Sequence, residues 1–261
     1  MKQRILTAIV GIIIILPIIL YGNWPFKLLA YVFSAIGLYE MIRMFGLKNK
    51  YGYFFISLLF MWLILYSKEP LFNFSLPVET MNLVVLMIVV LLIITVATKN
   101  EFSFNEASRL LLATLFLAFS FQYVIQVRFI SLEAFLFILF TIWATDSGAY
   151  FIGRKFGKRK LWPKISPNKT IGGALGGIVF AMVFATLFHL IHPFDKSFVS
   201  IVFISLFISI FGQLGDLVAS AIKRTYGIKD FGSIFPGHGG VLDRLDSFLF
   251  VLLMLQMVNY F

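Results

Sequence analysis

The chain has 261 residues, of which 60% are hydrophobic and 13% are charged, and its mean hydropathy is +0.95. A soluble globular domain carries about 25% charged residues, so this composition excludes a soluble protein and predicts a polytopic integral membrane protein. The chain has no cysteine, which excludes disulfide bonds and thiolate metal sites, and its net charge of +10 must be explained within a membrane protein.

Apolar runs follow one another along the whole chain. A helix needs about 20 residues to cross a bilayer, so these runs predict an all-α fold with about nine transmembrane helices. The first run begins like a signal peptide, but no small-x-small cleavage pattern follows it, so we interpret it as a retained span. We expect the helices near residues 5–22, 25–45, 51–66, 81–98, 107–126, 131–152, 171–192, 198–222 and 242–261.

Basic residues are distributed unevenly between the predicted loops. If the N-terminus is cytoplasmic, 18 of the 22 Lys and Arg residues fall on the cytoplasmic side. The positive-inside rule therefore predicts an N-in, C-out topology, and this topology accounts for the net charge. The basic segment 153–164 is explained by topology and anionic headgroups, with capture of an anionic substrate as the alternative. No soluble basic domain is present, so nucleic acid is excluded as a partner.

The chain divides by polarity, without a linker or an internal repeat. Residues 1–130 are predicted to form an N-terminal transmembrane region of about five helices. Residues 131–261 are predicted to form a C-terminal catalytic region of about four helices with cytoplasmic loops. Every cluster of buried polar residues is expected after residue 140, so function is expected in the second half.

The eighth run carries polar residues at intervals of three or four. This spacing places them on one stripe of a helix. A carboxylate at membrane depth costs about 2.5–3.5 kcal/mol, so Asp216 should face a polar cavity and meet a cation. A structural pair with Lys223 is the alternative. The stripe consists of Gln213, Asp216, Ser220, Lys223 and Arg224.

Two acids begin the ninth run. Asp243 and Asp246 are three residues apart, so both carboxylates point to one side of the helix. Capping of the helix N-terminus is the alternative role, but capping needs one acid and two neighbouring acids repel each other. A shared divalent cation removes that repulsion. Together with Asp216 these acids form an all-oxygen set, which favours Mg²⁺ or Mn²⁺ over zinc.

A glycine-rich loop, KDFGSIFPGHGG, lies between these two runs. Glycines before a helix allow backbone N–H groups to approach a phosphate closely. Next to three acids and several basic residues, the loop predicts a site for a metal-bound polyphosphate. The basic residues are Lys223, Arg224, Lys229 and Arg244.

Two further segments belong to the same predicted side of the membrane. Asp146 is expected at the cytoplasmic end of the sixth run, and Lys169 directly precedes the seventh, where a phosphate would lie. The overlapping pairs Gly172/Gly176 and Gly173/Gly177 predict close helix packing.

Residues 220–246, SAIKRTYGIKDFGSIFPGHGGVLDRLD, resemble the signature of the phosphatidate cytidylyltransferase family. The shared pattern is S-x-x-K-R, then K-D, then P-G-H-G-G-x-x-D-R-x-D. The segments GDL, D-x-G-A-Y and S-P-x-K-T are similar to other elements of the family, so the resemblance covers roughly residues 140–247. Family members commonly carry an acid or an amide where this chain has Gly172.

The resemblance implies transfer of the cytidylyl group of CTP to phosphatidate, giving CDP-diacylglycerol and pyrophosphate. The reaction would depend on Mg²⁺ and take place at the cytoplasmic face of a bacterial-type inner membrane. We expect Asp216, Asp243 and Asp246 to hold one or two Mg²⁺ ions, with Mn²⁺ as a substitute. Lys223, Arg224, Lys229 and Arg244 would balance phosphate charge, with further substrate contacts from Asp146, Lys169, Ser220, His238, Gly239 and Gly240.

Two alternatives remain open at this stage. One is the same chemistry on another lipid phosphate, as in the synthesis of CDP-archaeol. The other is a transporter for an anionic metabolite, although transporters usually show paired internal repeats. The expected partners are CTP, phosphatidate and membrane lipids, and a homodimer is compatible with the sequence.

Overall fold

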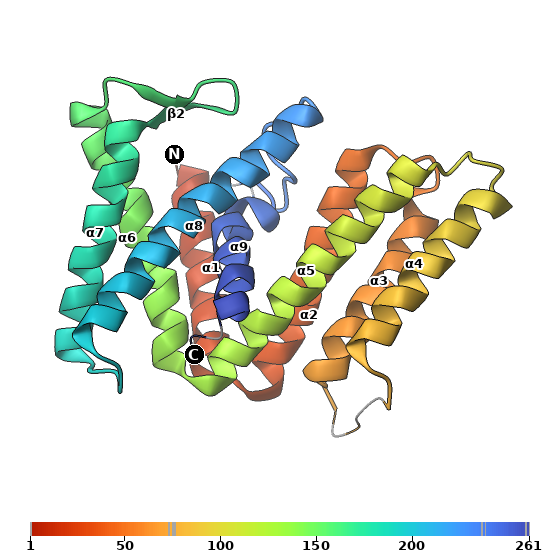
Figure 1. Cartoon of the computed structure of the whole chain (residues 1–261), viewed down its shortest axis with the longest axis horizontal. Coiled ribbons are helices and arrows are strands. Elements are labelled where there is room, and N and C mark those ends of the chain that lie inside the picture. The colour runs from red at the N-terminus through yellow and green to blue at the C-terminus, as the bar shows by residue number, and fades with distance from the viewer. Residues whose placement is uncertain are drawn as a thin grey trace. The chain divides into compact units, whose positions relative to one another are not determined.

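The computed structural model describes residues 2–72, 74, 77–235, 237, 239–258 and 260. Within this part of the chain, each of the nine predicted runs forms a helix (Figure 1). The ends agree with the prediction to within four residues, the largest differences being at 130 against 126 and at 156 against 152. The helices are α1 (Lys2–Tyr21), α2 (Asn23–Phe45), α3 (Lys50–Lys68), α4 (Thr80–Ala97), α5 (Phe104–Ile130), α6 (Leu132–Phe156), α7 (Ile171–Ile191), α8 (Phe198–Thr225) and α9 (Leu242–Val258).

Seven of the described helices, α2 to α8, are long and apolar enough to cross a membrane. The chain is therefore an integral membrane protein. Helix α1 has 20 residues, and α9 has 17 residues and starts with a charged turn. Membrane crossing by α1 and α9 stays a prediction, as does the N-in, C-out orientation.

Local capping contacts fix the beginnings of the helices in the second half. The side chain of Ser131 accepts a hydrogen bond from the Ala134 N–H at the start of α6. Thr170 does the same for α7, and Ser197 for α8. Hydroxyl side chains at this position satisfy N–H groups that have no partner within the helix. The sequence thus sets where α6, α7 and α8 begin.

The chain packs into two compact units. The first contains Met1–Phe129 together with Asp230–Arg244, and the second contains Ile130–Lys229 together with Leu245–Phe261. In the first unit, α2 packs against α1 and α3, and α3 packs against α4. In the second unit, α6, α7 and α8 pack against one another (Figure 1).

Glycines allow α6 and α7 to approach closely. A Cβ atom at Gly177 would lie 2.8 Å from the backbone oxygen of Thr145, and one at Gly173 would lie 2.8 Å from that of Ala149. Close packing through the Gly173/Gly177 pair is therefore confirmed. Gly176 also lies close to α6, since a Cβ atom there would overlap the Ile152 side chain, whereas a Cβ atom at Gly172 would have its nearest neighbour at 3.5 Å, an ordinary contact distance.

A small hairpin connects α6 to α7 and was not predicted. Strand β1 (Lys160–Trp162) pairs antiparallel with β2 (Ser166–Thr170), with Lys160 opposite Thr170. The sequence indicated only a basic loop here. The hairpin crosses the ends of α6 and α7 and ends at Thr170, directly before the first residue of α7, so it holds Lys169 beside that helix start (Figure 1).

Candidate functional site

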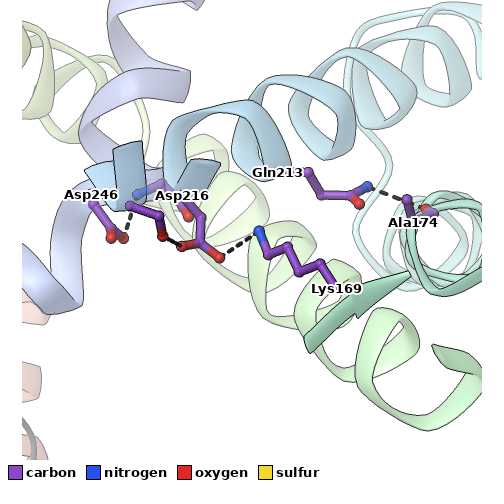
Figure 2. A network of polar contacts seen from close by, with 7 residues as sticks. Lys169, Ala174, Gln213, Asp216 and Asp246 are labelled. Atoms are coloured by element: carbon purple, nitrogen blue, oxygen red, sulfur yellow. Dashed lines mark hydrogen bonds and ion pairs between the residues drawn. The ribbon is translucent and has the colours of Figure 1, made fainter. Parts of the chain in front are cut away.

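Asp216 is the centre of a polar network in the second unit (Figure 2). Its Oδ2 atom lies 2.5 Å from the Lys169 ammonium nitrogen, and its Oδ1 atom accepts a hydrogen bond from the Ser220 hydroxyl at 3.3 Å. One turn earlier on α8, Gln213 donates a hydrogen bond to the Ala174 carbonyl oxygen of α7 at 3.3 Å. Gln213 and Asp216 of the predicted stripe therefore face α7 and the hairpin.

The acidic partner of this ion pair lies inside the membrane-spanning helix α8, whereas Lys169 lies in β2. Asp216 is nine residues before the end of α8 at Thr225, which corresponds to about 13 Å along the helix axis. The expectation that Asp216 meets a cation is confirmed, and the cation is Lys169. The side chains of Lys169 and Asp216 are 26% and 35% exposed, so a ligand can reach both.

Asp146 belongs to the same network but lies deeper than predicted. Because α6 continues to Phe156, Asp146 is ten residues, about 15 Å, from the end of the helix and not at that end. Its side chain is exposed and interacts electrostatically with Asp216 and Lys169. The second unit thus brings together Asp146, Lys169, Asp216 and Ser220.

The basic residues at the end of α8 have different environments. Lys223 is buried, whereas Arg224 and Lys229 are exposed. The Arg224 guanidinium donates a hydrogen bond to the Ile228 carbonyl oxygen at 2.9 Å, and the Ile228 N–H donates to the Lys223 carbonyl oxygen at 3.0 Å. Arg224 therefore stabilises the turn that follows α8.

In the first unit, Asp243 holds the glycine-rich loop in place. Its Oδ2 atom accepts hydrogen bonds from the Phe231 N–H at 2.8 Å and the Gly240 N–H at 2.9 Å. Gly239 has a φ of +88°, and a Cβ atom there would lie 2.8 Å from the same oxygen. One oxygen of Asp243 therefore accepts a hydrogen bond at the N-terminus of α9, as the capping alternative predicts.

Glu40 is the residue that sequence reasoning missed. It lies in α2 and is 2% exposed. Its Oε1 atom accepts a hydrogen bond from the Val241 N–H, and its Oε2 atom accepts one from the Leu242 N–H, both at 3.0 Å. The expectation that buried polar clusters fall only after residue 140 is wrong. The signal was available, because an ionisable residue inside a spanning helix is costly and is a functional candidate by default.

Arg244, Asp246 and His238 are the remaining residues of the predicted site. Arg244 is exposed, and Asp246 accepts a hydrogen bond from the Ser247 N–H at 2.7 Å. Asp246 appears in the same polar region as Asp216 and Lys169 in Figure 2. His238 lies outside the described residues.

The donor chemistry of the predicted metal ligands fits Mg²⁺. Asp216, Asp243 and Asp246 offer only carboxylate oxygens, and the Asp216 carboxylate already stabilises a positive charge, the Lys169 ammonium. Among the described residues, no group of three Asp, Glu or His side chains is close enough to hold a metal ion. Magnesium binding stays a prediction.

Comparison with known proteins identifies the class. The family model described as the cytidylyltransferase family matches residues 2–261. The chain therefore belongs to the cytidylyltransferase family, a family of nucleotidyltransferase enzymes, and the resemblance seen in residues 220–246 is confirmed.

The names of similar proteins specify an activity within this family. A protein of Bacillus subtilis (strain 168) is 44% identical over 255 residues, which cover 97% of this chain and 95% of the relative. Proteins of Staphylococcus haemolyticus (strain JCSC1435) and Staphylococcus saprophyticus are 39% and 38% identical, covering 99% of this chain and 98% of each relative. All three carry the name phosphatidate cytidylyltransferase.

Proposed function

We propose that this chain is a phosphatidate cytidylyltransferase of phospholipid biosynthesis, with its active site at the cytoplasmic face of a bacterial inner membrane. The main support is the partly exposed Lys169–Asp216 ion pair, whose acid lies inside α8, in a chain similar over nearly its whole length to enzymes of that name. A lipid phosphate and a soluble nucleotide can meet where charged side chains lie inside a spanning helix.

The reaction joins two anions. A phosphatidate oxygen attacks the α-phosphorus of CTP, the new P–O bond forms, and the bond to the β-phosphate breaks as pyrophosphate leaves. A phosphate monoester with a second pKa near 6 is largely dianionic at pH 7, so no general base is needed. Catalysis then consists of aligning the reactants and neutralising the leaving group.

The chain's own cations perform the neutralisation. Lys169 supplies positive charge beside Asp216 of α8, and its partial burial strengthens its interaction with a phosphate. Asp216 and Ser220 position its ammonium group, and Asp146 adds to the field around it. Lys223, Arg224, Lys229 and Arg244 are proposed to balance the charge of the nucleotide.

A divalent cation completes the proposal. Asp216, Asp243 and Asp246 are the proposed ligands of Mg²⁺, with Mn²⁺ or a second cation as variants. When bound, the ion would neutralise phosphate oxygens and polarise the phosphorus centre.

One assay tests the proposed function. Purified protein in detergent is incubated with labelled CTP, Mg²⁺ and a panel of lipid phosphates that includes phosphatidate and an isoprenoid glycerol phosphate. We expect pyrophosphate release only with a lipid phosphate and fastest with phosphatidate. A preference for the isoprenoid lipid would favour the CDP-archaeol alternative. Uptake of CTP into proteoliposomes without pyrophosphate release would favour a transporter.

A further inference from the structure

Glu40 fastens the beginning of α9 to α2 within the first unit. The first turn of a helix has N–H groups without helical partners, and two of them, from Val241 and Leu242, donate to the two oxygens of this one carboxylate. Val241, Leu242 and Glu40 are all buried, at 1%, 3% and 2% exposure, so water cannot replace these hydrogen bonds.

The glycine-rich loop is shaped around the same carboxylate. A Cβ atom at Gly232 or at Gly240 would overlap the Glu40 carboxylate oxygens. At Gly232 the three nearest atoms to such a Cβ all belong to Glu40. The loop therefore passes against Glu40 at both of its ends, and the glycines at these positions permit that close approach.

Asp243 is connected to this arrangement through the backbone. The Gly240 N–H donates to Asp243, and the next two N–H groups donate to Glu40. Three consecutive N–H groups at the start of α9 are thus held by two carboxylates. A shift of Glu40 would move the backbone that sets the position of Asp243.

We propose that Glu40 is a positioning residue for the glycine-rich loop, acting through the N-terminus of α9 on Asp243 and on the glycines of the PGHGG motif. This inference rests on the proposed function and adds to it a residue from the N-terminal half, outside the family signature. Glu40 contributes to turnover by fixing the loop and does not touch the substrate.

The first test compares Glu40→Gln and Glu40→Ala by kinetics of cytidylyl transfer. Glutamine keeps one acceptor oxygen but turns an NH₂ group toward the second N–H, and alanine removes both acceptors. We expect kcat to fall about tenfold or more for Gln and further for Ala, with KM for phosphatidate unchanged, since small misplacements cost about 10²-fold. Ser34→Ala is the matched control, because Ser34 is also fully buried in α2 and its hydroxyl donates to the Tyr31 carbonyl oxygen of the same helix. Wild-type kcat in folded, monodisperse Glu40→Ala protein would overturn the proposal.

A second test does not depend on activity. The chain has no native cysteine, so Val241→Cys places a single thiol at the buried start of α9. Leaving buried N–H groups unsatisfied promotes local opening, so this thiol should react with maleimide about tenfold faster or more in the Glu40→Gln background. An unchanged labelling rate would contradict a positioning role. This test stands even if the wild-type protein shows no cytidylyl transfer, an outcome that would reject only the proposed function.

A double-mutant cycle isolates the contact itself. Gly232→Ala should displace the Glu40 carboxylate and lower kcat in the wild-type background, because the three atoms nearest to its Cβ all belong to Glu40. In the Glu40→Ala background the same substitution should have little further effect, which is the non-additivity expected of residues in contact. Independent, additive losses would show that Gly232 and Glu40 act separately and would overturn the shared mechanism.

Discussion

Glu40 and Asp216 both lie inside apolar helices, but their negative charges are stabilised in different ways. Asp216 is held by the Lys169 ammonium, and both side chains are partly exposed. Glu40 is held by two backbone N–H groups and is buried. The flexible Lys169 side chain can move from Asp216 to another anion, such as a phosphate. The backbone N–H groups that bind Glu40 are fixed at the start of α9 and cannot move away from it. Asp216 therefore suits a role with a changing partner, and Glu40 suits a fixed one.

The Lys169 side chain is expected to act directly on the phosphates of CTP. Lys169→Met removes the ammonium that faces Asp216, so kcat/KM for CTP should fall about 10²–10³-fold, as for loss of one group that stabilises transition-state charge. Lys164→Met is the control, because Lys164 is exposed in the same hairpin. Steady-state kinetics with purified variants measures the effect. Equal kinetics for the two variants would show that Lys169 has only a structural role.

Asp243 and Asp246 provide the second prediction. Asparagine at position 243 keeps an oxygen that can accept the Phe231 and Gly240 hydrogen bonds, so Asp243→Asn removes charge but preserves the loop. If these acids bind Mg²⁺, turnover should fall about 10²-fold or more in either Asn variant, and its dependence on metal concentration should shift. Asp195→Asn, in the exposed loop after α7, is the control. Normal turnover with unchanged metal dependence in both variants would leave only the capping role.

The spacing of polar residues along the sequence predicted that Asp216 belongs to a polar site, but it gave no indication of the role of Glu40. Gln213, Asp216 and Ser220 recur along one helix, so their common face is visible in the sequence. Glu40 is a single acid in α2, and its donors lie 201 and 202 residues away. No helical period connects such residues. Rotamers and partner choice, such as the Asp216 pairing with Lys169, likewise follow from tertiary contacts.

The hairpin between α6 and α7 places Lys169 beside Asp216. Close approach of α6 and α7 depends on glycines, and the Thr170 side chain caps α7 directly after Lys169. The helices were predictable from runs of apolar residues. The hairpin was not, because KLW and SPNKT show no strand-like alternation and their register is irregular.

The helix contact predicts the effect of a single methyl group. Gly177→Ala brings a Cβ atom within 2.8 Å of a backbone oxygen, which cannot move without shifting α6. Overpacking of this kind costs about 1–3 kcal/mol, so the midpoint of thermal unfolding in detergent should fall by about 2–10 °C. Gly172→Ala is the matched control on the same helix, since its new Cβ would have no neighbour closer than 3.5 Å. Equal melting temperatures for the two variants would contradict the tight contact.

The distribution of charge along the chain predicts one orientation in the membrane. The basic residues of the hairpin and of the loop after α8 fall on the same predicted side, the cytoplasm. Seven described helices can cross a bilayer by length and composition, but length and composition do not determine which end of a helix faces the cytoplasm. Orientation therefore depends on the charges alone.

Single-cysteine labelling tests this orientation. Ser166→Cys and Ser233→Cys should be protected from an impermeant thiol reagent added to intact cells and should react after the cells are opened. Asp195→Cys, in the loop predicted to face outward, should react in intact cells. The reverse pattern would show a C-in topology and would place the proposed site on the wrong side for CTP.

The distance in sequence between Glu40 and the start of α9 also sets an order of events during synthesis. At about 5–20 residues per second, the ribosome makes Val241 about 10–40 s after Glu40. Throughout that interval α2 must reside at the membrane with its carboxylate lacking its final hydrogen-bond donors, at a cost of about 2.5–3.5 kcal/mol that its apolar residues offset. The acid made among the first helices is thus satisfied only when the last helix emerges. A nascent chain that stalls before Val241 is made keeps a Glu40 carboxylate without the hydrogen bonds from Val241 and Leu242 that it has in the full chain.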